Sequence, residues 1–193
     1  MQQYHQNPES RIRMLGSEDR QKWLKVDDLL KEAGISRGMT CVDLGCGAGT
    51  LSFPLLLSVG EEGKVYAVDS DERMIEHIRT KNPPANFVPV ISDADRTGLE
   101  DRTADFCFMV LLLHEVEEPD SVMTEAFRLL KPGGRALVLE WRVDLDIPHP
   151  PVNERINREQ IERLFEQAGF SGFEYIDWSR SHYIATGSKN QTV

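Results

Sequence analysis

A glycine-rich loop is the part of this sequence whose residue types most directly indicate ligand binding. Residues 42–50 read Val-Asp-Leu-Gly-Cys-Gly-Ala-Gly-Thr and overlap a short apolar segment, residues 40–44, that is predicted to be a strand. Closely spaced glycines after a strand let the backbone approach a ligand and expose N–H groups at the start of the next helix. A tight turn without a ligand is the alternative, but a turn alone rarely needs three alternating glycines.

The spacing and charge of this loop discriminate between nucleotide ligands. A dinucleotide fingerprint requires G-x-G-x-x-G, whereas Thr50 occupies the position of the third glycine here. Asp43 precedes Gly45 by two residues, where its negative charge would face a pyrophosphate unfavourably. The same carboxylate suits a ligand with a cationic amino group, such as the methionine end of S-adenosylmethionine. The loop therefore favours S-adenosylmethionine over NAD, and an NAD(P)-dependent Rossmann oxidoreductase is the weaker alternative.

Two further acidic residues stand at predicted strand ends. Asp69 ends the predicted strand 64–68 and can accept hydrogen bonds from both ribose hydroxyls; capping of the next helix is its alternative role, although Ser70 or Asp71 can serve as that cap. Asp93 can accept from an adenine amino group while the N–H of Ala94 meets a ring nitrogen. Met74 can pack on the adenine face, and packing in the core is an equal alternative.

His114 is the candidate general base, because it follows the predicted strand 105–111 near the expected position of the methyl group. A bound sulfonium is already a strong electrophile, so the protein need only align the acceptor and remove its proton where required. Helix capping or packing is the alternative role for this histidine. Glu115, Glu140, Trp141 and Arg142 border the same face and are expected to shape the acceptor pocket.

The elements that must position these residues alternate between strands and helices, which predicts right-handed crossovers and a mainly parallel sheet in a single domain of 193 residues. Residues 1–17 are expected to form an arm or lid, and residues 18–193 the core. Expected strands are 40–44, 64–68, 87–91, 105–111, 135–141, 173–178 and 183–186. Expected helices are 18–33, 50–59, 70–80, 121–130 and 158–168, and the short link 179–181 predicts an antiparallel hairpin.

Composition limits the partners and the compartment. The formal net charge of −10, with 32 acidic and 22 basic residues, disfavours nucleic acid and anionic membranes. The N-terminal residues carry no apolar signal segment, and the longest apolar run is too short to cross a bilayer. Cys41, Cys46 and Cys107 form no CxxC pair and are expected to be small buried residues in a reducing compartment. We therefore expect a cytoplasmic protein; a homodimer is compatible with the sequence but not indicated by it.

Taken in order, these segments resemble the class I S-adenosylmethionine-dependent methyltransferases, particularly the small type 11 group related to ubiquinone and menaquinone biosynthesis. The resemblance covers about residues 40–141, and its motifs are VDLGCGAGT (42–50), VYAVDSDERMI (65–75), ISDAD (91–95), ADFCFMVLLLHEV (104–116) and LLKPGGRALVLEW (129–141). It implies a doubly wound, Rossmann-like α/β fold whose seven strands have the order 3-2-1-4-5-7-6, the last-numbered strand being antiparallel. It also implies S-adenosylhomocysteine as product.

The resemblance further implies roles for individual residues. Backbone atoms of Gly45 and Gly47 would contact the methionine moiety, and the backbone carbonyl of Leu111 would accept from its ammonium group. Because the family's N-terminal arm often folds over the donor, Tyr4, Arg11 and Met14 are lid candidates. The expected donor-binding residues are Asp43, Gly45, Cys46, Gly47, Asp69, Ser70, Met74, Asp93, Ala94 and Leu111, with no metal ligand among them.

The methyl acceptor is narrowed but not identified by the sequence. After the fourth strand the chain reads Leu112-Leu-His-Glu115 and lacks the Asp/Asn-Pro-Pro-aromatic tetrad of amino-methylating DNA and glutamine enzymes. No His and carboxylate cluster has metal-ligand spacing, and the cysteines occupy core-like positions, unlike those of arsenite methyltransferases. A small-molecule oxygen, nitrogen or carbon acceptor is expected. A non-catalytic module that binds the donor or a protein partner is the second alternative.

Overall fold

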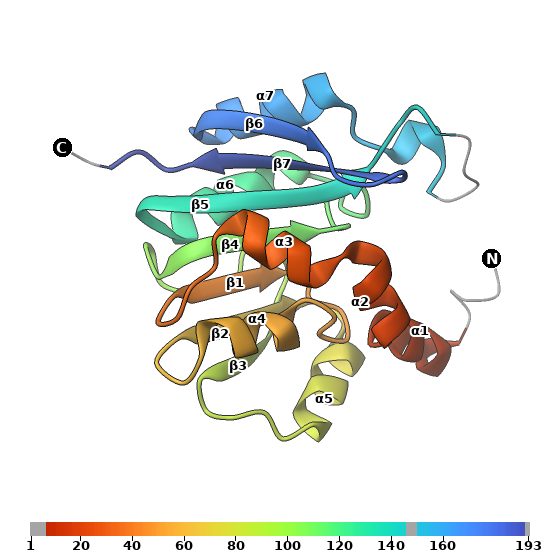
Figure 1. Cartoon of the computed structure of the whole chain (residues 1–193), viewed down its shortest axis with the longest axis vertical. Helices are drawn as coiled ribbons and strands as arrows, with labels where there is room; N and C mark the ends of the chain where they lie inside the picture. Colours follow the sequence, from red (N-terminus) through yellow and green to blue (C-terminus); the bar gives the residue numbers. More distant parts are fainter. Residues whose placement is uncertain (1–6, 146–149, 192–193) are drawn as a thin grey trace. The chain divides into compact units, whose positions relative to one another are not determined.

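The computed structural model describes residues 7–145 and 150–191 (Figure 1). The expected fold class is confirmed, because seven strands form one mixed sheet with the order β3-β2-β1-β4-β5-β7-β6. The chain divides into two compact units, residues 1–93 and 94–193, which are described separately below.

The first unit contains three parallel strands, and β2 lies between β1 and β3. Helix α4 packs on β1 and β2, α5 packs on β2 and β3, and α3 packs on α4. Its core is formed by apolar side chains that the helices and strands bury, including Leu29, Leu55, Ile75 and Ile78. The elements are α1 (Pro8–Leu15), α2 (Glu18–Leu24), α3 (Val26–Ala33), β1 (Thr40–Leu44), α4 (Ser52–Val59), β2 (Lys64–Asp69), α5 (Glu72–Thr80) and β3 (Phe87–Ile91).

The second unit contains one parallel and two antiparallel strand pairs. β4 is parallel to β5, whereas β7 is antiparallel to both β5 and β6, so the predicted hairpin is confirmed. Helix α6 packs on β4, β5 and α7, and α7 packs on β6 and β7. The elements are β4 (Ala104–Val110), α6 (Pro119–Leu129), β5 (Leu130–Trp141), the 3-10 helix η1 (Val152–Glu154), α7 (Arg158–Ala168), β6 (Ser171–Asp177) and β7 (His182–Ser188).

The prediction of one helix over residues 18–33 is wrong, because this segment forms two helices, α2 and α3. Lys25 separates α2 from α3 and adopts a left-handed conformation with φ of 54°. Leu24 and Val26 on either side are 1% and 3% exposed. Residues two apart do not share a face of one straight helix, so the break allows both side chains to be buried.

The predicted start of β5 also differs from the structure. Residues 131–134 (Lys-Pro-Gly-Gly) lie between the predicted helix 121–130 and the predicted strand 135–141, but they belong to β5, which begins at Leu130 directly after α6. Leu130 pairs with Ala104, and the register shifts before Arg135 pairs with Phe106. A Cβ atom on Gly134 would lie 3.1 Å from the Asp105 carbonyl oxygen, so this irregular stretch needs the absence of a side chain.

Candidate functional site

The glycine-rich loop connects β1 to the turn that precedes α4. Gly45, Gly47 and Gly49 all have positive φ, at 69°, 53° and 87°, which explains the alternation of glycines. The backbone N–H of Cys46 donates to the carbonyl oxygen of Val68 on β2 at 2.9 Å. The loop is therefore held to the neighbouring strand by its own backbone.

Asp69, the last residue of β2, holds this loop through hydrogen bonds. Its Oδ2 accepts from the backbone N–H of Gly47 at 2.8 Å, and its Oδ1 accepts from the N–H of Asp71 at 2.9 Å. Of the two predicted candidates, Ser70 and Asp71, it is Asp71 that is the N-cap of α5, and its side chain accepts from the N–H of Arg73. Asp69 thus joins the glycine loop to the start of α5, while its side chain remains partly exposed to solvent.

Asp43 lies on β1 and is 2% exposed. The hydroxyl of Ser52, the first residue of α4, donates a hydrogen bond to Asp43 Oδ2. Burial raises the pKa of Asp43 to about 7; the Ser52 hydrogen bond opposes this rise, and the negative charge of Asp69 adds to it. A carboxyl group with such a pKa changes its charge near neutrality, which is typical of functional sites.

The N-terminal arm contains a helix, α1, that was not predicted from the sequence. Asn7 caps α1 through its side chain, Pro8 occupies its first turn and Gly16 ends it, so the start and stop signals were present. The hydroxyl of Thr50 donates to the carbonyl oxygen of Leu15. A Cβ atom on Gly47 would lie 3.5 Å from a methyl carbon of Leu15. The end of α1 therefore contacts the glycine loop directly.

The remaining predicted donor residues of this unit differ in exposure. Met74 on α5 is 2% exposed, so it packs in the interior of the unit. Ser70 and Asp93 are exposed. Among the lid candidates, Arg11 lies on α1 close enough to lower the pKa of Asp71, whose main perturbation is its hydrogen bond with Arg73. Met14 is 41% exposed, and Tyr4 lies outside the described residues.

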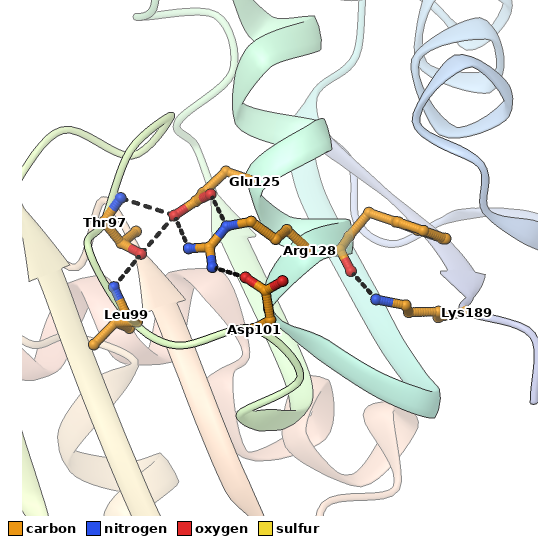
Figure 2. A network of polar contacts seen from close by, with 7 residues as sticks. Thr97, Leu99, Asp101, Glu125, Arg128 and Lys189 are labelled. Carbon is orange, nitrogen blue, oxygen red and sulfur yellow. Dashed lines mark hydrogen bonds and ion pairs between the residues drawn. The ribbon is translucent and has the colours of Figure 1, made fainter. Parts of the chain in front are cut away.

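In the second unit, a buried carboxylate holds the segment that follows Ala94. Glu125 Oε1 on α6 accepts from both the backbone N–H and the hydroxyl of Thr97, at 2.8 and 2.6 Å (Figure 2). The guanidinium of Arg128 donates to both oxygens of Glu125 and also pairs with Asp101. These contacts join the connection between β3 and β4 to α6.

Leu111 directly follows β4 and adopts an unusual backbone conformation. Its φ of 55° lies in the left-handed region, which non-glycine residues rarely occupy. Its N–H donates to the carbonyl oxygen of Leu139 at 2.8 Å, so β5 supports the strained residue. Backbone strain of this kind concentrates at functional sites, and it changes the direction of the Leu111 carbonyl group relative to the strand.

His114 forms a buried hydrogen bond with Glu140. The Nδ1 atom lies 2.8 Å from Oε2 and 3.0 Å from Oε1, and the two side chains are 7% and 0% exposed. The backbone N–H groups of His114 and Trp141 also donate to Glu140, at 3.3 and 3.2 Å. The Nε2 atom lies 3.9 Å from Oε1 of the more exposed Glu115.

The pKa of His114 reflects opposing influences. Burial lowers it, but the hydrogen bond and negative charge of Glu140, followed by the charges of Glu115 and Glu154, raise the pKa above its ordinary value of 6.5. With Nδ1 donating to a carboxylate, a neutral His114 carries its lone pair on Nε2. The arrangement is chemically suited to accept a proton at Nε2 and to stabilise the resulting imidazolium.

Comparison with known proteins decides the family of this chain. A family model described as a methyltransferase domain matches residues 42–138, just over half of the sequence. The chain belongs to this family. Within it, the chain is a member of the type 11 group of class I S-adenosylmethionine-dependent methyltransferases, as the sequence motifs predicted.

Relatives and solved structures agree with this assignment. This methyltransferase family member is 35% identical over 113 residues to the ubiquinone/menaquinone biosynthesis C-methyltransferase UbiE of Escherichia coli, covering 56% of this chain and 45% of UbiE. An uncharacterized 37.1 kDa protein of a Streptomyces fradiae transposon is 33% identical over 132 residues, covering 66% of this chain and 38% of that protein. The chain thus spans less than half of each of these relatives.

A crystal structure of an S-adenosylmethionine-dependent methyltransferase from Aquifex aeolicus has a TM-score of 0.85 and 29% identity, covering 93% of this chain and 97% of that one. Phosphoethanolamine N-methyltransferase 2 of Haemonchus contortus, solved with S-adenosylmethionine, has a TM-score of 0.74 and 18% identity, covering 88% and 53%. The second likeness concerns the fold.

Three features of the site were not predicted from the methyltransferase sequence. Glu140 was expected to border the acceptor pocket, but not to bind His114 Nδ1. Ser52 was not recognised as the partner of Asp43, and α1 was not recognised as a helix.

Cys41, Cys46 and Cys107 are all buried. Within the described ranges, 7–145 and 150–191, no group of three or more His, Cys, Asp or Glu side chains is arranged to hold a metal ion.

Proposed function

We propose that this chain transfers the methyl group of S-adenosylmethionine to a small-molecule oxygen, nitrogen or carbon acceptor and releases S-adenosylhomocysteine. The observation that carries this proposal is the glycine loop, in which the N–H of Gly47 donates to the Asp69 carboxylate and which directly follows the strand that holds the buried Asp43. When bound, the donor supplies an electrophilic methyl group on a sulfonium. The protein's part is to bind, to orient and to accept a proton.

The residues of the first unit fit such a donor. The glycine loop offers the backbone hydrogen-bonding groups of Gly45, Cys46 and Gly47, and these two glycines carry no side chain. Asp43 offers a negative charge for an ammonium group. Asp69 is partly exposed, so its oxygens remain available to ribose hydroxyls in addition to their present hydrogen bonds. Ser70 is exposed beside it, and Met74 would support the adenine side by packing.

The remaining donor contacts are proposed for residues at later strand ends. The exposed carboxylate of Asp93 and the N–H of Ala94 would form hydrogen bonds with the adenine edge. The hydrogen bond from Thr97 to Glu125 would hold the segment that follows Ala94 in place. Leu111 would direct its carbonyl group toward the donor's ammonium, and its left-handed backbone conformation would set the direction of that carbonyl. The arm would act as a lid through α1, with Arg11 and Met14 on its surface.

His114 is the proposed general base, and Glu140 is its positioning residue. Glu140 fixes the imidazole through Nδ1 and leaves Nε2 to receive the proton of the acceptor. Proton removal by a positioned side chain is worth about two to four orders of magnitude in rate. Substitution of His114 by alanine should therefore lower turnover much more than donor affinity, and unchanged turnover would eliminate the base role.

The organisation and location of the protein are also proposed. We propose one methyltransferase domain over residues 1–193, with residues 1–17 as its arm, a cytoplasmic location and no nucleic-acid partner. A homodimer is a further proposal.

Among the described residues, no helix is long and apolar enough to cross a membrane. A fold neighbour from Haloferax volcanii, 16% identical, was solved in complex with the Trm112 methyltransferase activator.

Calorimetric titration of S-adenosylmethionine, S-adenosylhomocysteine and NAD tests the proposal. Micromolar binding of the first two, without binding of NAD, is the expected result, and Asp69→Ala should weaken it at least tenfold. Glu62→Ala, which removes an exposed carboxylate elsewhere in the same unit, is the matched control. Failure of both donor ligands to bind would overturn the proposal. Binding without methyl transfer to any screened nucleophile would favour a non-catalytic binding module.

A further inference from the structure

A buried cation holds the described parts of the connection between β5 and α7, residues 142–145 and 150–157. Arg155 directly follows η1 and is 4% exposed. Its Nε donates to the carbonyl oxygen of Pro150 at 2.9 Å, and its Nη1 donates to those of Leu145 and Arg142, at 2.8 and 3.1 Å. A guanidinium presents its donors in a fixed planar geometry, which a lysine ammonium does not reproduce. Arg155 therefore joins the residues that leave β5 to those that lead into α7.

A second contact places the end of this connection near the His114–Glu140 pair. Tyr183 on β7 stands opposite Glu140 in the antiparallel register of β5 and β7, so the two side chains lie on the same face of the sheet. The hydroxyl of Tyr183, a residue that is 1% exposed, donates to the carbonyl oxygen of Ile156 at 2.9 Å. Burial, and then the charge of Glu140, raises the pKa of Tyr183, so the phenol remains a donor.

Glu154, the last residue of η1, adds a carboxylate from this connection to the surroundings of His114. Burial lowers the pKa of the imidazole, and the hydrogen bond and charge of Glu140 on β5 oppose that effect. The charges of Glu115, after β4, and of Glu154, on η1, raise the pKa further. Because a Coulomb interaction weakens with distance, the contribution of Glu154 depends on where η1 is held.

We infer that Arg155 is a positioning residue for His114, because its guanidinium keeps η1, and with it Glu154, beside the imidazole. The inference rests on the proposed role of His114 as the general base. In that step a proton passes from the acceptor atom to Nε2, and the acceptor atom keeps the electron pair of the broken bond. Glu154 then stabilises the imidazolium through its negative charge, and Arg155 acts through Glu154 without touching the reacting groups.

The test is the pKa of His114, measured by proton nuclear magnetic resonance of its imidazole Cε1–H in the full chain without ligand. The wild type, Glu154→Gln, Arg155→Lys and the variant with both substitutions form a double-mutant cycle. Lysine keeps the positive charge of Arg155, so a change in this variant reports the placement of the connection rather than the loss of a charge. Each single substitution should lower the pKa, and Arg155→Lys should lower it no further once Glu154 is glutamine.

A second variant loosens the same connection without changing its cation. Tyr183→Phe removes the hydroxyl that donates to Ile156 but keeps the ring, which stacks on Tyr175 with 4.7 Å between ring centroids. It should lower the pKa of His114 in the wild type and not in Glu154→Gln. Tyr175→Phe is the matched control, because it removes the hydroxyl of the neighbouring ring and leaves the Tyr183 hydrogen bond in place. It should leave the pKa of His114 unchanged.

The outcomes separate this inference from the proposed function. An equal fall in the pKa of His114 on Arg155→Lys with and without Glu154, or no fall in either background, would overturn the inference and leave the base role standing. If Arg155→Lys does not fold, Tyr183→Phe decides by the same comparison. Unchanged turnover in His114→Ala would overturn the base role, and with it the place of Arg155 in the reaction.

Discussion

The imidazole Nδ1 of His114 lies 2.8 Å from Oε2 of Glu140, and both side chains are almost completely removed from solvent. The two residues belong to consecutive strand ends, since His114 follows β4 and Glu140 lies on β5. β5 runs parallel to β4, with Val110 beside Leu139. This register brings an acid and a base together at the carboxyl edge of the sheet, where α/β folds place their ligands.

Substitution of Glu140 by glutamine should lower the pKa of His114. Burial then acts against the imidazolium without the negative charge that offsets it. Proton nuclear magnetic resonance of the imidazole Cε1–H, assigned by comparison with His114→Gln, measures the change. Glu115→Gln is the control, because Glu115 lies 3.9 Å from Nε2 and its side chain is 54% exposed, so its removal should shift the pKa less. Equal shifts in the two variants would contradict the assigned partnership.

The same pair should make stability depend on pH. Because the folded-state pKa of His114 is raised above its ordinary value of 6.5, its contribution is fully present below pH 6.5 and lost as pH rises through the folded-state value. If His114 is the base, turnover should instead rise over that interval, since the neutral imidazole is the active form. Denaturant unfolding of the wild type and Glu140→Gln across this range checks the first statement.

Substitution of Asp43 by asparagine should stabilise the protein without ligand at pH 8. The ordinary pKa of 3.8 rises to about 7 in the folded protein. The folded state therefore holds a proton that the unfolded chain has lost, and stability falls as pH rises from about 4 to 7. The full penalty is at most about 4 kcal/mol at pH 8, and asparagine removes it while its amide oxygen still accepts from Ser52.

Urea unfolding at pH 4, 6 and 8 measures this effect. The gap between Asp43→Asn and the wild type should widen with pH, whereas Glu62→Gln, at an exposed carboxylate, should show no such trend. A gap that is constant with pH would mean that folding does not raise the pKa of Asp43.

Removal of the Glu125 side chain should destabilise the second unit. Glu125→Ala leaves the buried N–H and hydroxyl of Thr97 without their acceptor and Arg128 without its buried partner (Figure 2). Unsatisfied buried donors of this kind cost about 1–3 kcal/mol. Asp101→Ala removes the other partner of Arg128, but the Asp101 side chain is 72% exposed, so its loss should cost less than about 1 kcal/mol. Chemical denaturation compares the two, and similar losses would refute the central role of Glu125.

Particular residues show what the sequence determines. Asn157 caps α7 through its side chain and Gly169 follows the end of this helix, and both residue types favour these positions because capping depends on local hydrogen bonds. The alternating glycines at residues 45–49 adopt positive φ values, a local conformation that glycine favours. By contrast, Lys25 and Leu111 adopt positive φ although neither residue type favours it. Neither residue type gives a local signal of a positive φ, so these conformations were not predicted from the sequence.

The pairing of site residues depends on the register between strands. His114 and Glu140 are far apart in the sequence, and the prediction that both face one pocket did not extend to their hydrogen bond. The same limit applies to Asp43 and Ser52, since a strand residue and a helix residue meet only after the loop between them has folded. Sequence patterns therefore predicted which strand ends bear candidate site residues, and the structure was needed to match the partners.

Replacement of Thr50 by valine should loosen the N-terminal arm. Valine has nearly the same shape but lacks the hydroxyl that donates to the Leu15 carbonyl oxygen, and Thr50 is 7% exposed, so water does not readily replace this bond. Hydrogen–deuterium exchange should rise in residues 8–16 and remain unchanged in β1 and β2. Thr80→Val is the matched control, because its hydroxyl also donates to a backbone carbonyl, that of His77, at an exposed helix end. Faster exchange of the arm in both variants would show that the Thr50 contact does not hold it. If the arm covers the donor, S-adenosylhomocysteine should restore part of the protection in Thr50→Val, since the ligand would supply contacts that the missing hydroxyl no longer provides.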